Sequence, residues 1–317
     1  MTRILHLSDT HVSATGRDGD GVDAIAALER MLYDLRHVPD LDLVVVSGDI
    51  ADDGSAAGCA AVRARIGEFA ARRRIPHIYS TGNHDDRTGF RDALGSGHIG
   101  ADGTDIGKLI DNAGDLRAAV TPVGGLRVIT LDSLVPGETH GVVDERQLRW
   151  LSGLLSSPTE VGTVLVFHHP PLRFPAIPNV KRVVLQNIDE LEDVVSGTDV
   201  RAILTGHLHF QASGFLGGVP LWVTPGVVTR IDTTAERHLV RGVLGAGATV
   251  VDVTEPTAPT FHLLHARDPR AGEEVYVYDA LTGADVAESE PAPSQAATAS
   301  HRGLHGSPAA HSRGGYR

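Results

Sequence analysis

Five short polar motifs each follow directly after an apolar run, and this pairing constrains the fold more than any other feature of the chain. In order, they are Asp9-Thr10-His11, Gly48-Asp49, Gly82-Asn83-His84-Asp85, His168-His169-Pro170 and Gly206-His207-Leu208-His209. Leu43–Val46 is a continuous aliphatic run, as expected of a strand that is buried on both faces. Two stretches with helical periodicity separate the first three runs. This alternation predicts an α/β fold with a parallel core sheet and helices outside it.

Capping residues indicate where the helices begin. Asp23 precedes an apolar face with helical spacing, and Ala56–Arg73 also has the character of a helix. Asp144 and Gln147 have the spacing of a capping box, which predicts the start of another helix. Residues 86–118 are polar, rich in Gly and Asp, and weakly periodic. We therefore expect them to form loops and short helices that lie over the side chains of the five motifs.

Further short apolar runs in the second half of the chain predict more strands. Three of them are Val128–Leu131, Val164–Phe167 and Ala202–Leu204. Three later runs are expected to form a second, more antiparallel sheet: Pro220–Val223, Thr249–Val253 and Thr260–Leu264. The pattern fades after about Asp268, which predicts a domain at 1–267 and a C-terminal tail at 268–317. From about residue 288 the tail has almost no large apolar side chain, so we expect disorder there.

Composition excludes several classes of protein. The 317 residues include 28 Lys+Arg and 40 Asp+Glu, a net charge of −12, whereas a nucleic-acid binder needs a basic surface. Cys59 is the single cysteine, so no internal disulfide can form. No apolar run approaches ~18 residues, so no membrane span is expected. No signal-peptide pattern follows Met1, and we expect a soluble, cytoplasmic protein.

The motif side chains form a mixed set of carboxylate, amide and imidazole donors. Loops at the carboxyl ends of parallel strands are where α/β sheets place their ligands. Asp49 has two carboxylate oxygens and is the candidate for bridging two ions. The expected ligands are Asp9, His11, Asp49, Asn83, His168, His207 and His209. With one carboxylate shared, they make two sites of about four ligands each, which leaves open positions for water and substrate. Such a set suits Mn, Fe, Zn or Co better than Ca.

The expected side-chain directions rest on an extended backbone. Asp9 and His11 are alternate residues, so their side chains would point the same way in an extended chain. The same geometry lets only one of His168 and His169 point inward. His168 is taken as the ligand, and His169 as a loop residue or a supporting residue.

His84 has a different expected role, because it lies next to a ligand and could donate a proton without binding a metal. Simpler interpretations exist for each motif alone. The Asp-x-His pair could be a polar loop residue and a histidine at the edge of the core, and Asn83 with His84 could form a turn. Asp49 could cap the following helix, although Asp53 or Ser55 would serve better. The remaining histidines are expected to be ordinary core or surface residues.

The ordered motif set resembles the calcineurin-like metallophosphoesterase superfamily over about residues 2–265. Within it, the closest resemblance is to the bacterial class III cyclic nucleotide phosphodiesterases. This resemblance rests on Asp-x-His, Gly-Asp-x-x-Asp, Gly-Asn-His-Asp, His-His-Pro-Pro and Gly-His-x-His, and on the segments 135–137 and 197–204. It implies a four-layer α/β/β/α sandwich. It also implies two metal sites that share one residue: Asp9, His11, Asp49 and His209 for one ion, and Asp49, Asn83, His168 and His207 for the other.

The same resemblance implies a mechanism. A bridging hydroxide would attack phosphorus, and His84 would protonate the leaving 3′ oxygen to give a 5′-monophosphate. Asp52 would orient His84, and a solvated loop carboxylate is the alternative for Asp52. The implied substrate contacts are His11, Asn83, His84 and His209. His140 is a further candidate, with a surface-loop position as the alternative.

Substrate identity is less constrained by these motifs than the chemistry is. The first hypothesis is a 3′,5′-cyclic nucleotide phosphodiesterase that acts on cAMP. A glycerophosphodiesterase, or a phosphodiesterase or phosphatase of broad specificity, would use the same ligands. A non-catalytic binding scaffold is the third hypothesis, and the intact ligand set argues against it. The resemblance also suggests a homodimer.

Overall fold

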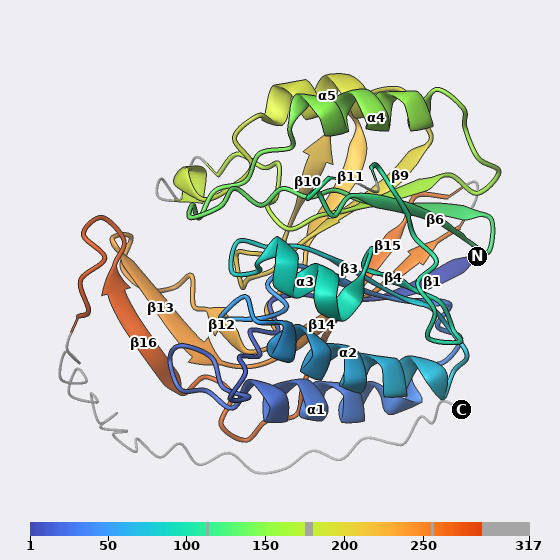
Figure 1. Ribbon diagram of the computed structural model, residues 1–317. Coiled ribbons are helices and arrows are strands. Elements are labelled where there is room, and N and C mark those ends of the chain that lie inside the picture. Colours follow the sequence, from blue (N-terminus) through green and yellow to red (C-terminus); the bar gives the residue numbers. More distant parts are fainter. Residues whose placement is uncertain (112–113, 175–179, 255–256, 287–317) are drawn as a thin grey trace, which may run out of the picture. The chain divides into compact units, whose positions relative to one another are not determined.

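Two β-sheets lie face to face, and helices cover the outer face of each sheet (Figure 1). The computed structural model describes residues 1–111, 114–174, 180–254 and 257–286. Met1–Val286 forms one compact unit. The mixed α/β fold expected from the sequence is confirmed, with differences in how the later strands are distributed.

The first sheet contains the strands that end in the first three motifs. Its members are β1 (Thr2–Leu7), β2 (Leu43–Ser47), β3 (His77–Ser80), β4 (His98–Ile99), β14 (Gly247–Val253) and β15 (Thr260–His265). The order is β15-β14-β1-β2-β3-β4, in which β1, β2 and β3 are parallel and the other neighbours are antiparallel. The prediction that β14 and β15 belong to the second sheet is therefore wrong. Alternating apolar residues predict a strand, but packing across the whole domain decides its partner.

The second sheet contains the strands that end in the last two motifs. Its members are β5 (Lys108–Leu109), β6 (Ala119–Val123), β7 (Leu126–Thr130), β8 (Thr163–Val166), β9 (Val200–Thr205), β10 (Ala212–Leu216) and β11 (Val219–Val223). The order is β10-β11-β9-β8-β7-β6-β5, with a parallel centre and antiparallel edges. The segment expected to hold loops and short helices also contributes the short strands β4 and β5.

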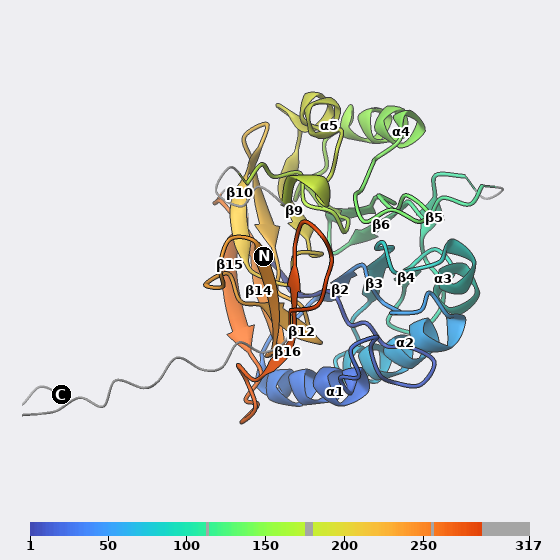
Figure 2. The same ribbon diagram turned by 90° about the vertical axis from the view of Figure 1, so that its left-hand side faces the viewer.

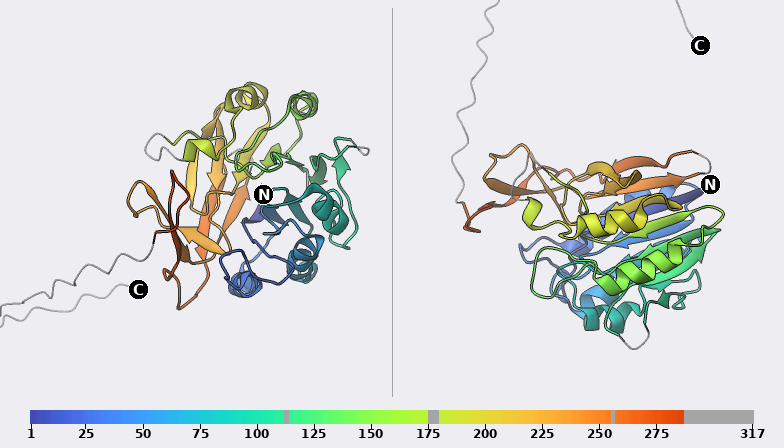
Figure 3. Two further views of the ribbon diagram at one scale, coloured as in Figure 1. Left: turned by 60° about the vertical axis from the view of Figure 1, so that its left-hand side comes forward. Right: turned by 90° about the horizontal axis from the view of Figure 1, so that it is seen from above.

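The layers follow from three apolar clusters. The helices α1 (Ala24–Asp34), α2 (Ala56–Ala71) and α3 (Arg87–Leu94) pack on the first sheet. The helices α4 (Glu145–Leu155) and α5 (Ile188–Val195) pack on the second. Between the sheets, Ile4 and Val45 meet Val164 and Leu204 in a third cluster. Figures 2 and 3 show both sheets enclosed between the two groups of helices, which confirms the four-layer sandwich.

Side-chain caps begin the first two helices at the expected places. Asp23 accepts a hydrogen bond from the Ala26 N–H at 3.0 Å and caps α1. Ser55 accepts from the Gly58 N–H at 3.0 Å and caps α2. Asp49 is therefore not needed as the cap of this helix and can serve the site. A 3-10 turn at 35–37 follows α1, and another lies at 180–182.

The capping box expected at α4 forms only in part. Asp144 accepts from the Gln147 N–H at 2.9 Å, as predicted. The Gln147 amide does not return a bond to the cap, because it is buried and bonds to the backbone N–H and C=O of Asp132, both at 2.8 Å. The side chain therefore ties α4 to the end of β7.

A third, small sheet consists of β12 (Thr229–Ile231), β13 (Leu239–Leu244) and β16 (Glu274–Asp279). Because β16 pairs with β13 along its length, ordered structure continues past residue 267, where the sequence predicted the domain to end. The disorder expected from about residue 288 lies outside the described residues. Within the described part of the chain, no helix is long and apolar enough to cross a membrane.

Candidate metal centre

The five motifs lie together at the carboxyl ends of parallel strands from both sheets. Five strands lead into the candidate ligands: β1 into Asp9 and His11, β2 into Asp49, β3 into Asn83, β8 into His168, and β9 into His207 and His209. Hydrogen bonds join these loops, both between the two sheets and within the first sheet. The His207 N–H donates to both carboxylate oxygens of Asp9 at 3.1 Å, and the Asp9 N–H donates to the Gly48 carbonyl at 3.1 Å. One edge of the sandwich therefore gathers every predicted ligand.

Carboxylate oxygens and imidazole nitrogens converge at this edge. Asp49 Oδ2 lies 3.1 Å from His168 Nε2 and 3.5 Å from His11 Nε2. Asp9 Oδ1 lies 3.4 Å from His209 Nε2 and 3.9 Å from His168 Nε2. One oxygen of Asp49 thus lies within 3.5 Å of a ring nitrogen of both His11 and His168.

Imidazole nitrogens also face each other in pairs. His11 Nε2 and His209 Nε2 are 3.1 Å apart, and His207 Nδ1 and His168 Nε2 are also 3.1 Å apart. A neutral imidazole has one donor and one acceptor nitrogen, so each pair is either an N–H···N hydrogen bond or, when both facing nitrogens lack a proton, two lone pairs directed at each other. In the second case, a cation between the two rings of a pair would bind both of them.

Hydrogen bonds on the opposite ring nitrogen fix three of these histidines. His168 Nδ1 lies 2.8 Å from the Ser47 carbonyl oxygen. His209 Nδ1 lies 3.1 Å from the Thr229 carbonyl oxygen and 3.0 Å from its hydroxyl. His11 Nδ1 lies 2.8 Å from the Asp52 carboxylate. Each contact leaves Nε2 directed at the centre, which is the arrangement that metal-binding histidines commonly have.

Asn83 offers an independent test of whether these residues fit a metal. Its Oδ1 is buried and has no hydrogen-bond partner among the described residues. A buried acceptor without a partner costs ~1–3 kcal/mol, so such an atom needs a ligand of another kind. An amide oxygen beside carboxylates and imidazoles suits a divalent transition metal. The donor set therefore fits metal ions.

Backbone strain is concentrated at the same residues. Asp9, His11, Asp49, His207 and His209 all have positive φ, between 43° and 72°. Side chains disfavour this left-handed region, and such strain collects at functional sites. The prediction that an extended chain directs Asp9 and His11 to one side is wrong in its geometry, although both side chains reach the cluster.

Two glycines of the motifs are required by close approach. A Cβ on Gly82 would lie 2.2 Å from Asp49 Oδ1, and a Cβ on Gly48 would lie 2.5 Å from His168 Nδ1. Gly48 also has φ +92°. Each glycine therefore makes room for a ligand that comes from another loop.

Beside the converging nitrogens, His84 is the exposed member of the group, with 42% of its side chain accessible. Its Nδ1 lies 3.1 Å from the Asp52 carbonyl oxygen and 3.4 Å from the Asp52 carboxylate. Burial disfavours the protonated ring, but the charge of Asp49 and the bonds to Asp52 outweigh burial and raise the pKa of His84 to about 10. The Asp52 carboxylate lies nearer to His11, at 2.8 Å, so Asp52 supports two histidines rather than His84 alone.

Comparison with known proteins identifies the family of the chain. The family model described as calcineurin-like phosphoesterase matches residues 2–211. The chain belongs to this family. A Rhodococcus erythropolis protein named probable cyclic nucleotide phosphodiesterase is 38% identical over 257 residues, which cover 80% of each chain. A Mycobacterium tuberculosis protein named cAMP/cGMP dual specificity phosphodiesterase is 34% identical over 86% of this chain and 80% of its own.

An Escherichia coli K12 protein named 3′,5′-cyclic adenosine monophosphate phosphodiesterase is also similar to this calcineurin-like phosphoesterase. It is 32% identical over 70% of this chain and 75% of its own. The superfamily inferred from the motifs is therefore confirmed. Because the family match ends at residue 211, the third sheet lies outside the matched segment.

His169 lies closer to the site of this phosphoesterase than its sequence position suggested. Its Nδ1 is 2.8 Å from the Ser133 hydroxyl, and its ring centroid is 4.6 Å from that of His207. One ring nitrogen from each of His168, His169 and His207 lies within 4.8 Å of the other two. His169 Nε2 is buried and has no hydrogen-bond partner among the described residues. His169 is thus a buried neighbour of the candidate ligands.

The loop that contains His140 borders this region. A Cβ on Gly141 would lie 2.4 Å from the ring of His169, so the loop packs directly against that histidine. His140 itself is half-buried, and its Nδ1 lies 3.6 Å from the Glu138 carboxylate. A contact between His140 and substrate stays a prediction.

Asp85 has a structural role that the sequence reasoning missed. Its buried carboxylate accepts hydrogen bonds from the N–H groups of Ile50 at 3.1 Å, Ala51 at 2.9 Å and Gly82 at 2.9 Å. Burial and the charge of Asp49 raise the pKa of Asp85 to about 6. Asp85 therefore locks the loop after β2 to the loop after β3. The position of Asp85 in the Gly-Asn-His-Asp motif was a signal for this role.

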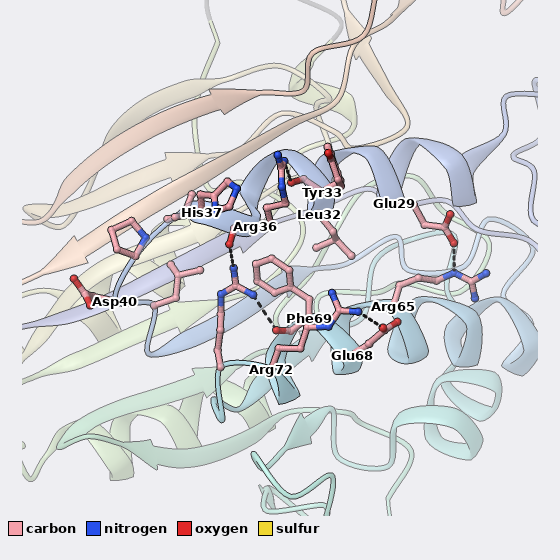
Figure 4. Close-up of a pocket in the computed structure, with 14 residues that line it drawn as sticks. Glu29, Leu32, Tyr33, Arg36, His37, Asp40, Arg65, Glu68, Phe69 and Arg72 are labelled. Carbon is pink, nitrogen blue, oxygen red and sulfur yellow. Dashed lines mark hydrogen bonds and ion pairs between the residues drawn. The ribbon is translucent and has the colours of Figure 1, made fainter.

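A cavity of about 850 Å³ lies apart from these residues, between α1 and α2 (Figure 4). Its arginines serve the ends of the helices: Arg36 donates to the Tyr33 carbonyl at 2.6 Å, and Arg73 donates to the Arg36 carbonyl at 2.8 Å. Two further arginines pair with neighbouring glutamates. The residues that line this cavity include none of the candidate ligands.

Proposed function

We propose that this calcineurin-like phosphoesterase hydrolyses 3′,5′-cyclic nucleotides, with cAMP as the first candidate, and that it uses two metal ions. One observation carries the proposal: Asp49 lies 3.1 Å from His168 and 3.5 Å from His11, between two groups of donors. A carboxylate placed in this way can bind two cations, and two-metal sites are typical of enzymes that cleave phosphate esters. The names of the three relatives support a cyclic nucleotide as substrate.

The proposed ligands divide into two sets that share Asp49. One set adds Asp9, His11 and His209, and the other adds Asn83, His168 and His207. When bound, the cations neutralise charge on the phosphate oxygens and make water a better nucleophile at neutral pH. The chain itself fixes the donors, because Ser47, Thr229 and Asp52 hold the opposite ring nitrogens of three histidines. Mn, Fe, Zn and Co remain candidates for the ions.

His84 is the proposed proton donor. Its Nδ1 faces Asp52, which leaves Nε2 for the substrate, and its side chain is exposed at the edge of the cluster. Cleavage of a 3′,5′-cyclic nucleotide expels a sugar alkoxide, which is a poor leaving group and needs a proton. Protonation of the 3′ oxygen would give a 5′-monophosphate. The phosphate is proposed to contact His84 together with His11, Asn83 and His209.

The chemistry can be tested with bis(p-nitrophenyl) phosphate and Mn²⁺, with and without chelator. We expect turnover that chelator abolishes and that Mn²⁺ restores. An absence of metal-dependent turnover would refute the proposal and leave a binding scaffold as the alternative. The substrate is then tested by kcat/KM for cAMP, cGMP, 2′,3′-cAMP and glycerophosphodiesters. A preference for glycerophosphodiesters would retain the chemistry and refute the nucleotide substrate. A cytoplasmic location and a homodimer stay predictions from the sequence.

A further inference from the structure

We propose that Tyr276, on a strand outside the matched family segment, positions the candidate metal ligand His209 through Thr229. The proposal rests on the metal site described under the proposed function, and it concerns a residue that no motif includes. It assigns part of the metal centre to the small third sheet. Tyr276 is therefore a positioning residue, because it acts on His209 through another side chain.

The register of the third sheet places the three residues in line. Gly242 of β13 is paired with Tyr276 of β16 on one side and with Ile231 of β12 on the other. Thr229 is two residues before Ile231, so it lies on the same face of the sheet. The Tyr276 side chain is therefore on the face of the sheet that carries Thr229, and Gly242 lies between the two strands.

Gly242 has no side chain, and the Tyr276 ring occupies the space above it. A Cβ on Gly242 would lie 2.2 Å from Cζ and 2.5 Å from Cε1 of Tyr276. The ring thus lies against the backbone of β13, and its hydroxyl is close enough to the Thr229 side chain to interact with it. Burial raises the pKa of Tyr276, whereas Thr229 lowers it, which is the effect of a Thr229 hydroxyl that donates towards the Tyr276 oxygen.

Thr229 in turn holds His209. His209 Nδ1 lies 3.0 Å from the Thr229 hydroxyl and 3.1 Å from its carbonyl oxygen. The backbone is tied at the same place, because the Ile231 N–H donates to the His209 carbonyl at 3.1 Å. With Nδ1 occupied, Nε2 is the nitrogen that faces Asp9 and His11. The strand β12 therefore sets both the position and the ring orientation of His209.

Tyr278 provides a matched control on the same strand. It lies two residues along β16, on the same face as Tyr276, and the two ring centroids are 5.9 Å apart. Both tyrosines are half-buried. Of these two tyrosines, Tyr276 is the one that lies over Gly242 and interacts with Thr229. Replacing each tyrosine with phenylalanine removes one hydroxyl group from the same strand. A comparison of the two variants therefore distinguishes loss of the contact with Thr229 from a general effect on the third sheet.

The test compares Tyr276→Phe, Tyr278→Phe, Thr229→Val and the double variant Tyr276→Phe/Thr229→Val in the full chain. Metal affinity is measured by competition with a chromophoric chelator for Mn²⁺, and the ligand field by the visible spectrum of the Co²⁺ form. Loss of a supporting partner typically weakens metal binding ~10–100-fold, so we expect this range for Thr229→Val and a loss of about fivefold for Tyr276→Phe. The double variant should equal Thr229→Val, and Tyr278→Phe should match the wild type.

Equal affinities for Tyr276→Phe and Tyr278→Phe would overturn the proposal, as would additive losses in the double variant. These readouts do not depend on catalysis. A wild-type protein that binds Mn²⁺ but cleaves no diester would refute the proposed function, while the comparison of variants would still decide the role of Tyr276. A wild-type protein that binds no metal would overturn both.

Discussion

Replacing Gly82 with alanine should damage the metal centre by displacing Asp49. The new Cβ would lie 2.2 Å from Asp49 Oδ1 and 2.3 Å from Asp49 N, whereas ordinary contact begins at 3.4 Å. Closing this gap requires a movement of about 1.2 Å, and one of the close atoms is backbone, so a change of rotamer cannot provide it. A misplacement of about 1 Å at a reacting centre costs on the order of 10²-fold in rate. We therefore expect kcat/KM to fall by this order, together with partial loss of bound metal.

The assay is hydrolysis of bis(p-nitrophenyl) phosphate at saturating Mn²⁺, with metal content measured on the same samples by mass spectrometry. Gly153→Ala is the matched control, because Gly153 lies within α4 and a Cβ there would meet nothing within 4 Å. That control should keep its activity and gain up to ~1 kcal/mol in stability from helix propensity. If Gly82→Ala retains its metal and remains within twofold of Gly153→Ala, the reasoning about close approach is refuted.

Three further predictions address other parts of the site and the core. Asn83→Ala removes the buried amide oxygen, so we expect weaker binding of one ion in a metal titration, and unchanged affinity would contradict its assignment as a ligand. His84→Ala should keep its metal content but slow diesters with poor leaving groups by ~10²–10⁴ in steady-state kinetics, and loss of an ion would count against the role of proton donor. Burial lowers the pKa of His98 to about 3 in the folded state. The unfolded state, with a pKa near 6.5, takes up a proton that the folded state excludes, so stability falls as pH drops from ~6.5 towards 3, by up to ~1.4 kcal/mol per pH unit. Urea unfolding between pH 7 and 5 should show a smaller slope for His98→Gln, and an identical slope would exclude His98 as a contributor.

The strands that carry the ligands could be predicted because two signals coincide at their ends. A continuous aliphatic run such as Leu43–Val46 requires burial on both faces, and a charge such as Asp49 directly after it requires a partner. The buried histidines outside the motifs also follow a simple expectation. His98 lies between the hydroxyls of Thr121 at 2.8 Å and Thr130 at 2.9 Å, as an ordinary core histidine should.

Other features could not be predicted, because they depend on the assembled domain. Asp9 and His207 adopt positive φ, and only the surrounding fold can hold a non-glycine residue in that strained region. The partner of β14 is likewise decided by packing between the sheets. The strand β16 is different, because its Val-Tyr-Val-Tyr segment has high β-propensity and was a usable signal. It was missed because it stands alone after a polar stretch, where no neighbouring run suggests a sheet.

The origin of the ligands in both sheets has a consequence for the lifetime of the protein. An ion held by Asp49 of one sheet and His168 of the other would act as a removable cross-link, in a chain whose single cysteine is free and buried. By mass action, such an ion adds ~4 kcal/mol when free metal exceeds its Kd a thousandfold, which compares with ~2–4 kcal/mol for a disulfide. Resistance to heat and to proteases would then follow the supply of metal. Cells short of metal would lose the protein itself as well as its activity.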